Sequence, residues 1–240
     1  MFRGIKEDRA VLYALLSFWI CVIIFHINGT RQSRETVGTH FTGLPTVIID
    51  PGHGGMDGGA VSVTGKYESD INWDTAVRVR DLLRFTGFRT VMTRDRQVIV
   101  YPEDVKGIAS RKKWDTRQRV EYINSFDKAV LISIHQNYYP SAQPWGAQVL
   151  YAQNEPSRFL GEALQSLLSD LLQPENRRVA APVGKEIYIL NHVNCTAVLL
   201  ECGFLSNPRE APLLETAPVQ KKTAAVIAAA LYRFAGDEHA

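Results

Sequence analysis

Three histidines lie within the part of this 240-residue chain that forms a domain: His53, His135 and His192. The others are in an apolar N-terminal run, a polar stretch and the C-terminal tail: His26, His40 and His239. His53 belongs to DPGHGGMDGGA, a glycine-rich segment in which the backbone can turn sharply and present the ring at a strand end. The segment lacks the GxxxxGK[ST] and GxGxxG patterns, which argues against a phosphate site.

Two carboxylates complete a set of metal-type residues. Glu201 lies within the apolar run AVLLECGF, where an ionised carboxylate costs several kcal/mol to bury unless a partner such as a cation is near. Glu68 comes 15 residues after His53, just before an expected helix. Taken singly, Glu68 reads more readily as a surface residue at a helix N-terminus, and His135 as a hydrogen-bonded core histidine. Together these residue types suit a zinc hydrolase site, in which imidazole and carboxylate ligands leave one position open.

The surrounding sequence alternates strand-like and helix-like segments. Apolar, β-rich runs predict strands at residues 46–50, 88–93, 129–135, 146–151, 187–190 and 197–203. Helical periodicity predicts helices at residues 70–85, 116–124, 157–172 and 218–234, the first capped by Ser69 or Asp70. The fold class is therefore α/β, a single domain with a central, mostly parallel twisted sheet flanked by helices. In such sheets chemistry gathers at the carboxyl ends of strands, where His53, His135 and Glu201 all fall.

The motifs IDPGHGGMDGGA, SIHQN and ECGFLSN, in this order and with a glutamate before a helix, resemble those of the zinc-dependent N-acetylmuramoyl-L-alanine amidases. The resemblance runs over residues 46–234. It implies one Zn²⁺ per chain with His53, Glu68 and His135 as ligands, and Glu201 as the catalytic carboxylate. The implied reaction is hydrolysis of the amide bond between N-acetylmuramic acid and L-alanine in peptidoglycan.

Further segments, RKKWDTRQRV, YIL and the proline after ECGFLSN, resemble the germination-specific branch of that family. That branch implies action on spore cortex as a step toward muramic δ-lactam and coupling to a peptidoglycan deacetylase. Some amidases also depend on an activating partner, and residues 96–116 are a candidate surface for one. Asn191 and His192 depart from the basic residue expected after YIL, so His192 reads as a rim or structural residue rather than a fourth ligand.

Four other polar residues near the motifs remain open. Arg94, Asn137 and Asn207 stand at strand ends and are as consistent with structural roles as with substrate contacts. Asp57 is a candidate for orienting a ligand ring. The substrate-binding residues are otherwise unknown from the sequence.

The N-terminus predicts export. Residues 1–10 are basic, and residues 11–27 form a 17-residue apolar run that reads as an uncleaved signal anchor or, less favoured, a cleaved signal peptide. Residues 28–43 read as a linker and residues 44–236 as the catalytic domain. Lysine and arginine before the run place the domain outside the membrane, either anchored or secreted and, in the implied branch, in the spore intermembrane space.

Composition limits the alternatives. The formal net charge of +2 lacks the concentrated basic patch of a nucleic-acid-binding protein, so no nucleic-acid partner is expected. Cys195 and Cys202 would lie roughly 23 Å apart in an extended strand, too far for a disulfide. The rival readings are a zinc carboxypeptidase acting on wall peptides and a non-catalytic wall-binding protein of the same fold.

Overall fold

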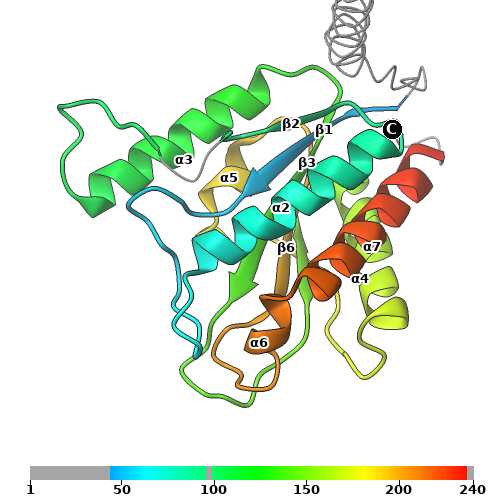
Figure 1. Cartoon of the computed structure of the whole chain (residues 1–240). Coiled ribbons are helices and arrows are strands. Elements are labelled where there is room, and N and C mark those ends of the chain that lie inside the picture. The colour runs from blue at the N-terminus through cyan, green and yellow to red at the C-terminus, as the bar shows by residue number, and fades with distance from the viewer. Residues whose placement is uncertain (1–43, 96–98, 237–240) are drawn as a thin grey trace, which may run out of the picture. The chain divides into compact units, whose positions relative to one another are not determined.

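The computed structural model describes residues 44–95 and 99–236, which belong to one compact unit. Its centre is a six-stranded sheet in the order β2-β1-β3-β6-β4-β5. Figure 1 labels four of these strands, β2, β1, β3 and β6. The strands are β1 (Thr46–Pro51), β2 (Thr90–Met92), β3 (Ala129–Asn137), β4 (Gln148–Tyr151), β5 (Ala181–Pro182) and β6 (Thr196–Phe204). Among the described residues four of the five strand pairs are parallel, and β4 runs antiparallel to β6. The predicted α/β domain is confirmed, with a mixed sheet.

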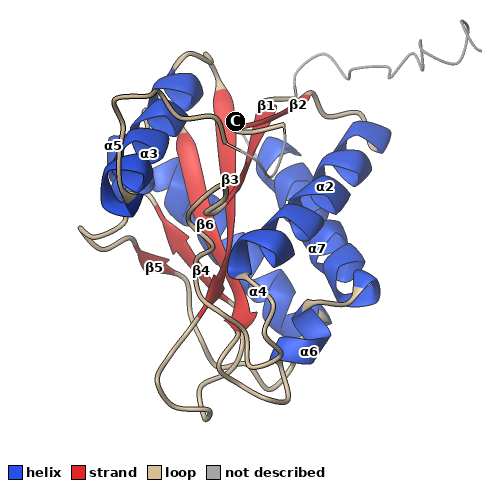
Figure 2. Ribbon diagram, turned by 60° about the vertical axis from the view of Figure 1, so that its left-hand side comes forward, coloured by secondary structure: helices blue, strands red, loops and turns tan. Residues whose placement is uncertain are grey.

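Helices cover both faces of this sheet (Figure 2). They are α2 (Glu68–Phe85), α3 (Ile108–Asn124), α4 (Glu155–Leu171), α5 (Tyr188–His192), α6 (Ala211–Leu214) and α7 (Ala217–Gly236). Helices α2, α4 and α7 pack on one face, while α3 and α5 lie on the other. Because strand side chains alternate between faces, the central strands are apolar on both sides and form two cores. Ile49, Ile132 and Leu200 belong to the first core, and Ile48 and Leu131 to the second.

The prediction of a strand at residues 187–190 is wrong, because this segment forms the short helix α5. Local hydrogen bonds favour the turn: the Asn191 side chain donates to the carbonyls of Gly184 and Ile187. The rings of Tyr188 and His192 stack one helical turn apart, with centroids 3.8 Å from each other. The apolar residues of this stretch pack on β6 without joining the sheet.

All four predicted helices begin earlier than their patterns predict, α4 at Glu155 rather than residue 157 and α7 at Ala217 rather than residue 218. Helix α2 starts at Glu68, preceded by Tyr67 in an extended conformation, so neither Ser69 nor Asp70 is its cap. Helix α3 starts at Ile108 rather than at residue 116. Most residues of its first two turns are polar and none is buried, so they carry no apolar period that would have indicated a helix.

The predicted N-terminal basic segment, signal anchor and linker lie outside the described residues. Within residues 44–95 and 99–236, no helix has the length and apolar character needed to cross a bilayer.

Candidate metal centre

The carboxyl ends of β1, β3 and β6 bring the predicted residues together. In the parallel register His135 of β3 lies beside Glu201 of β6, so both side chains project from the same face. His53 follows the end of β1, where the Gly52 amide donates to the Ile134 carbonyl at 2.9 Å. Residues from three distant parts of the sequence therefore meet at one sheet edge, as expected from the pattern.

Glu68 reaches this edge from the first turn of α2. The ligand-type atoms of His53, Glu68 and His135 all lie within 4.8 Å of one another. Glu68 Oε2 is 3.2 Å from His53 Nε2, and Glu68 Oε1 is 3.1 Å from His135 Nδ1. Two imidazoles and one carboxylate around a common point are the donor set of a zinc site with an open position, so the group fits zinc by its chemistry.

The Glu68 carboxylate is held by backbone amides as well as by the histidines. Its oxygens accept hydrogen bonds from the amides of Ala60 and Gln136, and from the Asn72 side chain. Burial alone would raise the pKa of Glu68, but the hydrogen bonds with His135 and His53 outweigh it and hold that pKa well below its usual range. Glu68 is therefore ionised, as a metal ligand must be.

Asp57 fixes the orientation of the His53 ring. Its Oδ2 lies 2.9 Å from His53 Nδ1, so that nitrogen carries the proton and Nε2 faces Glu68. Burial would lower the pKa of His53, but the hydrogen bonds with Asp57 and Glu68 raise it to about 9. A proton or a cation can occupy the same Nε2 lone pair, with Asp57 supporting either. Asp57 thus lies where the sequence suggested, hydrogen-bonded to the ring of His53.

Glu201 carries a carboxylate without a hydrogen-bond partner. Its Oε2 atom is buried, and no described residue hydrogen-bonds to it. Burial raises the pKa of Glu201, opposed by the nearby His135 ring. His53, Glu68 and His135 are called the metal-type cluster below. A carboxylate that is desolvated and faces this cluster is suited to exchanging protons with a reacting water.

A buried ion-pair network behind the His53 loop was not anticipated from the sequence. Arg119 of α3 is 4% exposed and contacts the fully buried Asp50 at 3.1 Å and Asp115 at 2.6 Å. Asp50 also accepts hydrogen bonds from Thr93 and Ser133. An aspartate inside the apolar run TVIID was the available signal, since it needs a buried partner.

The other candidates take varied positions. Asn207 is structural, because it accepts bonds from the amides of Arg209 and Glu210 and donates to the Pro144 carbonyl. His192 lies in α5, ahead of the amino end of β6, outside the metal-type cluster. Arg94 follows β2, and its Nε donates to the Pro51 carbonyl. Asn137 ends β3 beside Phe204.

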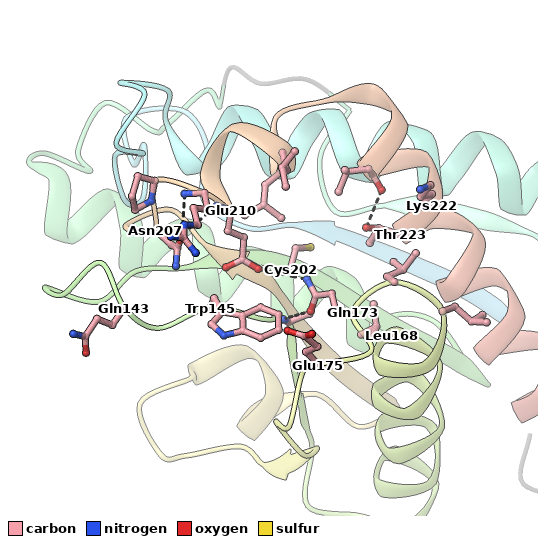
Figure 3. A pocket seen from close by; sticks show the side chains of 18 of the residues that line it. Gln143, Trp145, Leu168, Gln173, Glu175, Cys202, Asn207, Glu210, Lys222 and Thr223 are labelled. Atoms are coloured by element: carbon pink, nitrogen blue, oxygen red, sulfur yellow. Dashed lines mark hydrogen bonds between the residues drawn. The ribbon is translucent and has the colours of Figure 1, made fainter.

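A cavity of about 790 Å³ lies on the face of β6 opposite to the Glu201 side chain (Figure 3). Cys202 lines it, and because neighbouring strand residues point to opposite faces, Glu201 points away from it. Its lining is mostly apolar, with Trp145, Leu168 and Leu172. His53, Glu68, His135 and Glu201 do not line this cavity.

Comparisons with known proteins show the family and the fold. The sequence profile of the N-acetylmuramoyl-L-alanine amidase family matches residues 47–233. The germination-specific N-acetylmuramoyl-L-alanine amidase of Bacillus subtilis is 40% identical over 225 residues, covering 92% of each chain. The CwlD amidase of Clostridioides difficile, solved in complex with the GerS lipoprotein, superposes with a TM-score of 0.74 at 31% identity, covering 79% of this chain and 98% of that one.

A second C. difficile amidase, from strain 630, superposes with a TM-score of 0.71 at 25% identity, over 82% of this chain and 100% of that one. The family and reaction class predicted from the motifs are confirmed. This chain belongs to the N-acetylmuramoyl-L-alanine amidase family.

Proposed function

We propose that this amidase is zinc-dependent, with His53, Glu68 and His135 as the ligands of one Zn²⁺ and Glu201 as the catalytic carboxylate. The supporting observation is the cluster itself, in which three ligand-type residues gather within 4.8 Å beside a carboxylate that lacks a hydrogen-bond partner among the described residues. Neither a carboxypeptidase nor a non-catalytic wall-binding role has an observation that favours it.

The cluster supplies complementary chemistry for amide hydrolysis. A zinc ion held by His53, Glu68 and His135 would supply a positive charge able to polarise a carbonyl and to lower the pKa of water. Glu201 accepts a proton from the attacking water and returns one to the leaving nitrogen of L-alanine. Its buried Oε2 has no hydrogen-bond partner among the described residues, so no other donor competes with the water for that oxygen. Asp57 and Glu68 keep the histidine rings in place throughout.

We propose that the substrate is the peptidoglycan of the spore cortex and that hydrolysis is a step toward muramic δ-lactam. The B. subtilis relative, matched over 92% of its length, is described as germination-specific. A deacetylase acting on the stripped muramic acid would complete the lactam. The C. difficile neighbour is solved with a lipoprotein, which supports the idea of an activating partner for this chain too. The site of action is extracytoplasmic, in the spore intermembrane space, with the protein held at the membrane by its N-terminal segment or secreted.

Digestion of cortex muropeptides by the purified, zinc-loaded protein tests the reaction. Mass spectrometry is expected to find peptides with a new N-terminal L-alanine and muramic acid with a free lactyl carboxylate. Release of C-terminal amino acids instead would identify a carboxypeptidase and contradict the proposal.

Metal analysis tests the ligand set separately. One zinc per chain is expected in the wild-type protein, and His135→Ala is expected to lose it. Full zinc occupancy in that variant would remove His135 from the ligand set.

A further inference from the structure

A second cavity, of about 470 Å³, is lined by chain neighbours of His53 and Glu68. It is lined by Gly54, Gly55 and Met56, which directly follow His53, and by Ser69 and Asp70, which directly follow Glu68. The cavity therefore begins within one to three residues of two of the proposed zinc ligands. It is separate from the apolar cavity beyond β6.

The cavity has a cationic lining. Arg94 and Arg111 face it together with one acidic residue, Asp70. Arg94 is 9% exposed, and its guanidinium would lie 3.0 Å from a side chain at Gly54, directly beside His53. A guanidinium that is this well buried is a strong recognition element for a planar carboxylate, because little water competes for it.

Aromatic rings hold both guanidiniums in place. Arg94 lies 4.9 Å from the ring centroid of Trp73, while its Nε donates to the Pro51 carbonyl. Arg111 lies 5.2 Å from the ring centroid of Tyr101, and its Nε donates to the Val105 carbonyl. Stacking on an aromatic face reduces the side-chain entropy lost when a ligand binds. The two arginines are therefore preorganised.

The second cavity lies on the β2 side of the metal-type cluster. The sheet order β2-β1-β3-β6 puts the metal-type cluster at β1 and β3, with Glu201 on the β6 side. Arg94 follows β2 and marks the opposite side. On the β6 side the exposed rings of Tyr138 and Tyr139 follow β3, and the Tyr139 amide donates to Ser206, just beyond β6. One side of the centre is thus cationic and the other is aromatic.

The chemistry of the substrate matches this polarity. In muramoyl-L-alanine the lactyl carboxyl of the sugar is consumed in the scissile amide, so an N-acetylated glycan is uncharged there. The free carboxylates belong to the stem peptide. Uncharged sugar rings suit exposed aromatic faces, whereas carboxylates suit arginines. We infer that the Arg94–Arg111 cavity binds a carboxylate of the stem peptide beyond L-alanine, and so directs the peptide toward β2 and the glycan toward β6.

This inference rests on the proposed function, and a substrate series tests the two separately. The substrates are disaccharide–dipeptides whose second residue is D-glutamate, D-isoglutamine or its diamide, which carry two, one and no free carboxylates. For the zinc-loaded wild-type protein, kcat/KM is expected to be about 10-fold or more higher for the diacid than for the diamide, as a charge-assisted hydrogen bond provides. Absence of hydrolysis of every member would overturn the proposed function itself.

Substitutions then locate the discrimination. Arg111→Ala is expected to bring the diacid-to-diamide ratio close to one, and Arg111→Lys to retain part of it because the charge remains. Lys113→Ala, an exposed substitution on the same helix, is the matched control and is expected to keep the wild-type ratio. Arg94→Lys, with its melting temperature measured, tests the second arginine.

Hydrolysis at equal rates across the series by the wild-type protein would overturn the carboxylate site and leave the amidase assignment intact. A wild-type ratio retained in both Arg111→Ala and Arg94→Lys would show that the discrimination arises elsewhere, and would equally overturn it.

Discussion

Arg119 donates a hydrogen bond of 2.6 Å from its Nη2 to the carbonyl oxygen of His53. The backbone of His53 has φ of 60°, a left-handed conformation that costs a non-glycine residue about 1 kcal/mol or more. Arg119 also donates to the Pro51 carbonyl and pairs with Asp50, so one buried side chain holds the loop at both ends of the turn. The strained conformation presents the His53 ring, and Arg119 stabilises that conformation.

Replacing Arg119 by lysine is therefore expected to weaken metal binding while keeping the charge. A lysine ammonium cannot reach two carbonyls and two carboxylates at once, as the planar guanidinium does. We expect zinc affinity to fall about 10-fold or more, the usual effect of losing a group that orients a ligand. Chelator competition measures it, and thermal unfolding reports the accompanying loss of stability.

Arg117→Lys is the matched control, because Arg117 lies on the same helix but is exposed. Its zinc affinity is expected to equal that of the wild type. If Arg119→Lys bound zinc as tightly as the wild type, Arg119 would have only a stabilising role.

Glu201→Gln is expected to retain zinc and to abolish turnover. The amide has nearly the same shape as the carboxylate but cannot accept the proton of the attacking water. Metal analysis and amide-hydrolysis assays of the same preparation separate the two effects. Hydrolysis at the wild-type rate by this variant would exclude Glu201 as the proton acceptor.

Gly52→Ala is expected to damage the metal centre through contact alone. A Cβ at Gly52 would lie 2.2 Å from Cε1 of His135, so the ring must move. We expect loss of stoichiometric zinc with a far-ultraviolet circular dichroism spectrum like that of the wild type. Gly236→Ala is the control, since a Cβ there meets nothing within 4 Å. Normal zinc content in Gly52→Ala would mean that His135 tolerates the displacement.

The partly buried thiol of Cys195 predicts a loss of stability at alkaline pH. Burial raises its pKa to about 11, whereas in the unfolded chain the thiol ionises near pH 8.5 to 9. The raised folded-state pKa means that its contribution is complete below about pH 9 and is lost as pH rises toward 11, by at most about 3 kcal/mol. Denaturant unfolding of the wild type and of Cys195→Ala between pH 8 and pH 11 measures the difference.

The two proteins should diverge only in the alkaline part of that range. Parallel pH profiles throughout would contradict the assignment. Alkylation at pH 8, mapped by mass spectrometry, is expected to be slow at Cys195 in the native protein and fast in denaturant, because the thiolate is the reacting form.

Much of the site could be predicted from the sequence because its residues stand at the ends of strong apolar runs. His135 closes one such run and Glu201 interrupts another, and parallel strands carry such positions to one edge. The motifs then led to the family, which the comparisons confirm. The same reasoning gave a wrong prediction for residues 187–190. Their apolar residues suit a strand, but hydrogen bonds from the Asn191 side chain favour a helical turn.

The sequence by itself determined the α/β domain, the family and the residue types available for catalysis, because apolar periodicity and motif order are properties of the chain. Only the tertiary structure decided what surrounds them. Arg119 lies 66 residues from His53, and Arg111 and Arg94 face one cavity from a helix and a strand end. No local pattern encodes such contacts, because they depend on how α3 packs against the sheet. The support of the His53 backbone and the pairing of two arginines at one cavity arise from that packing.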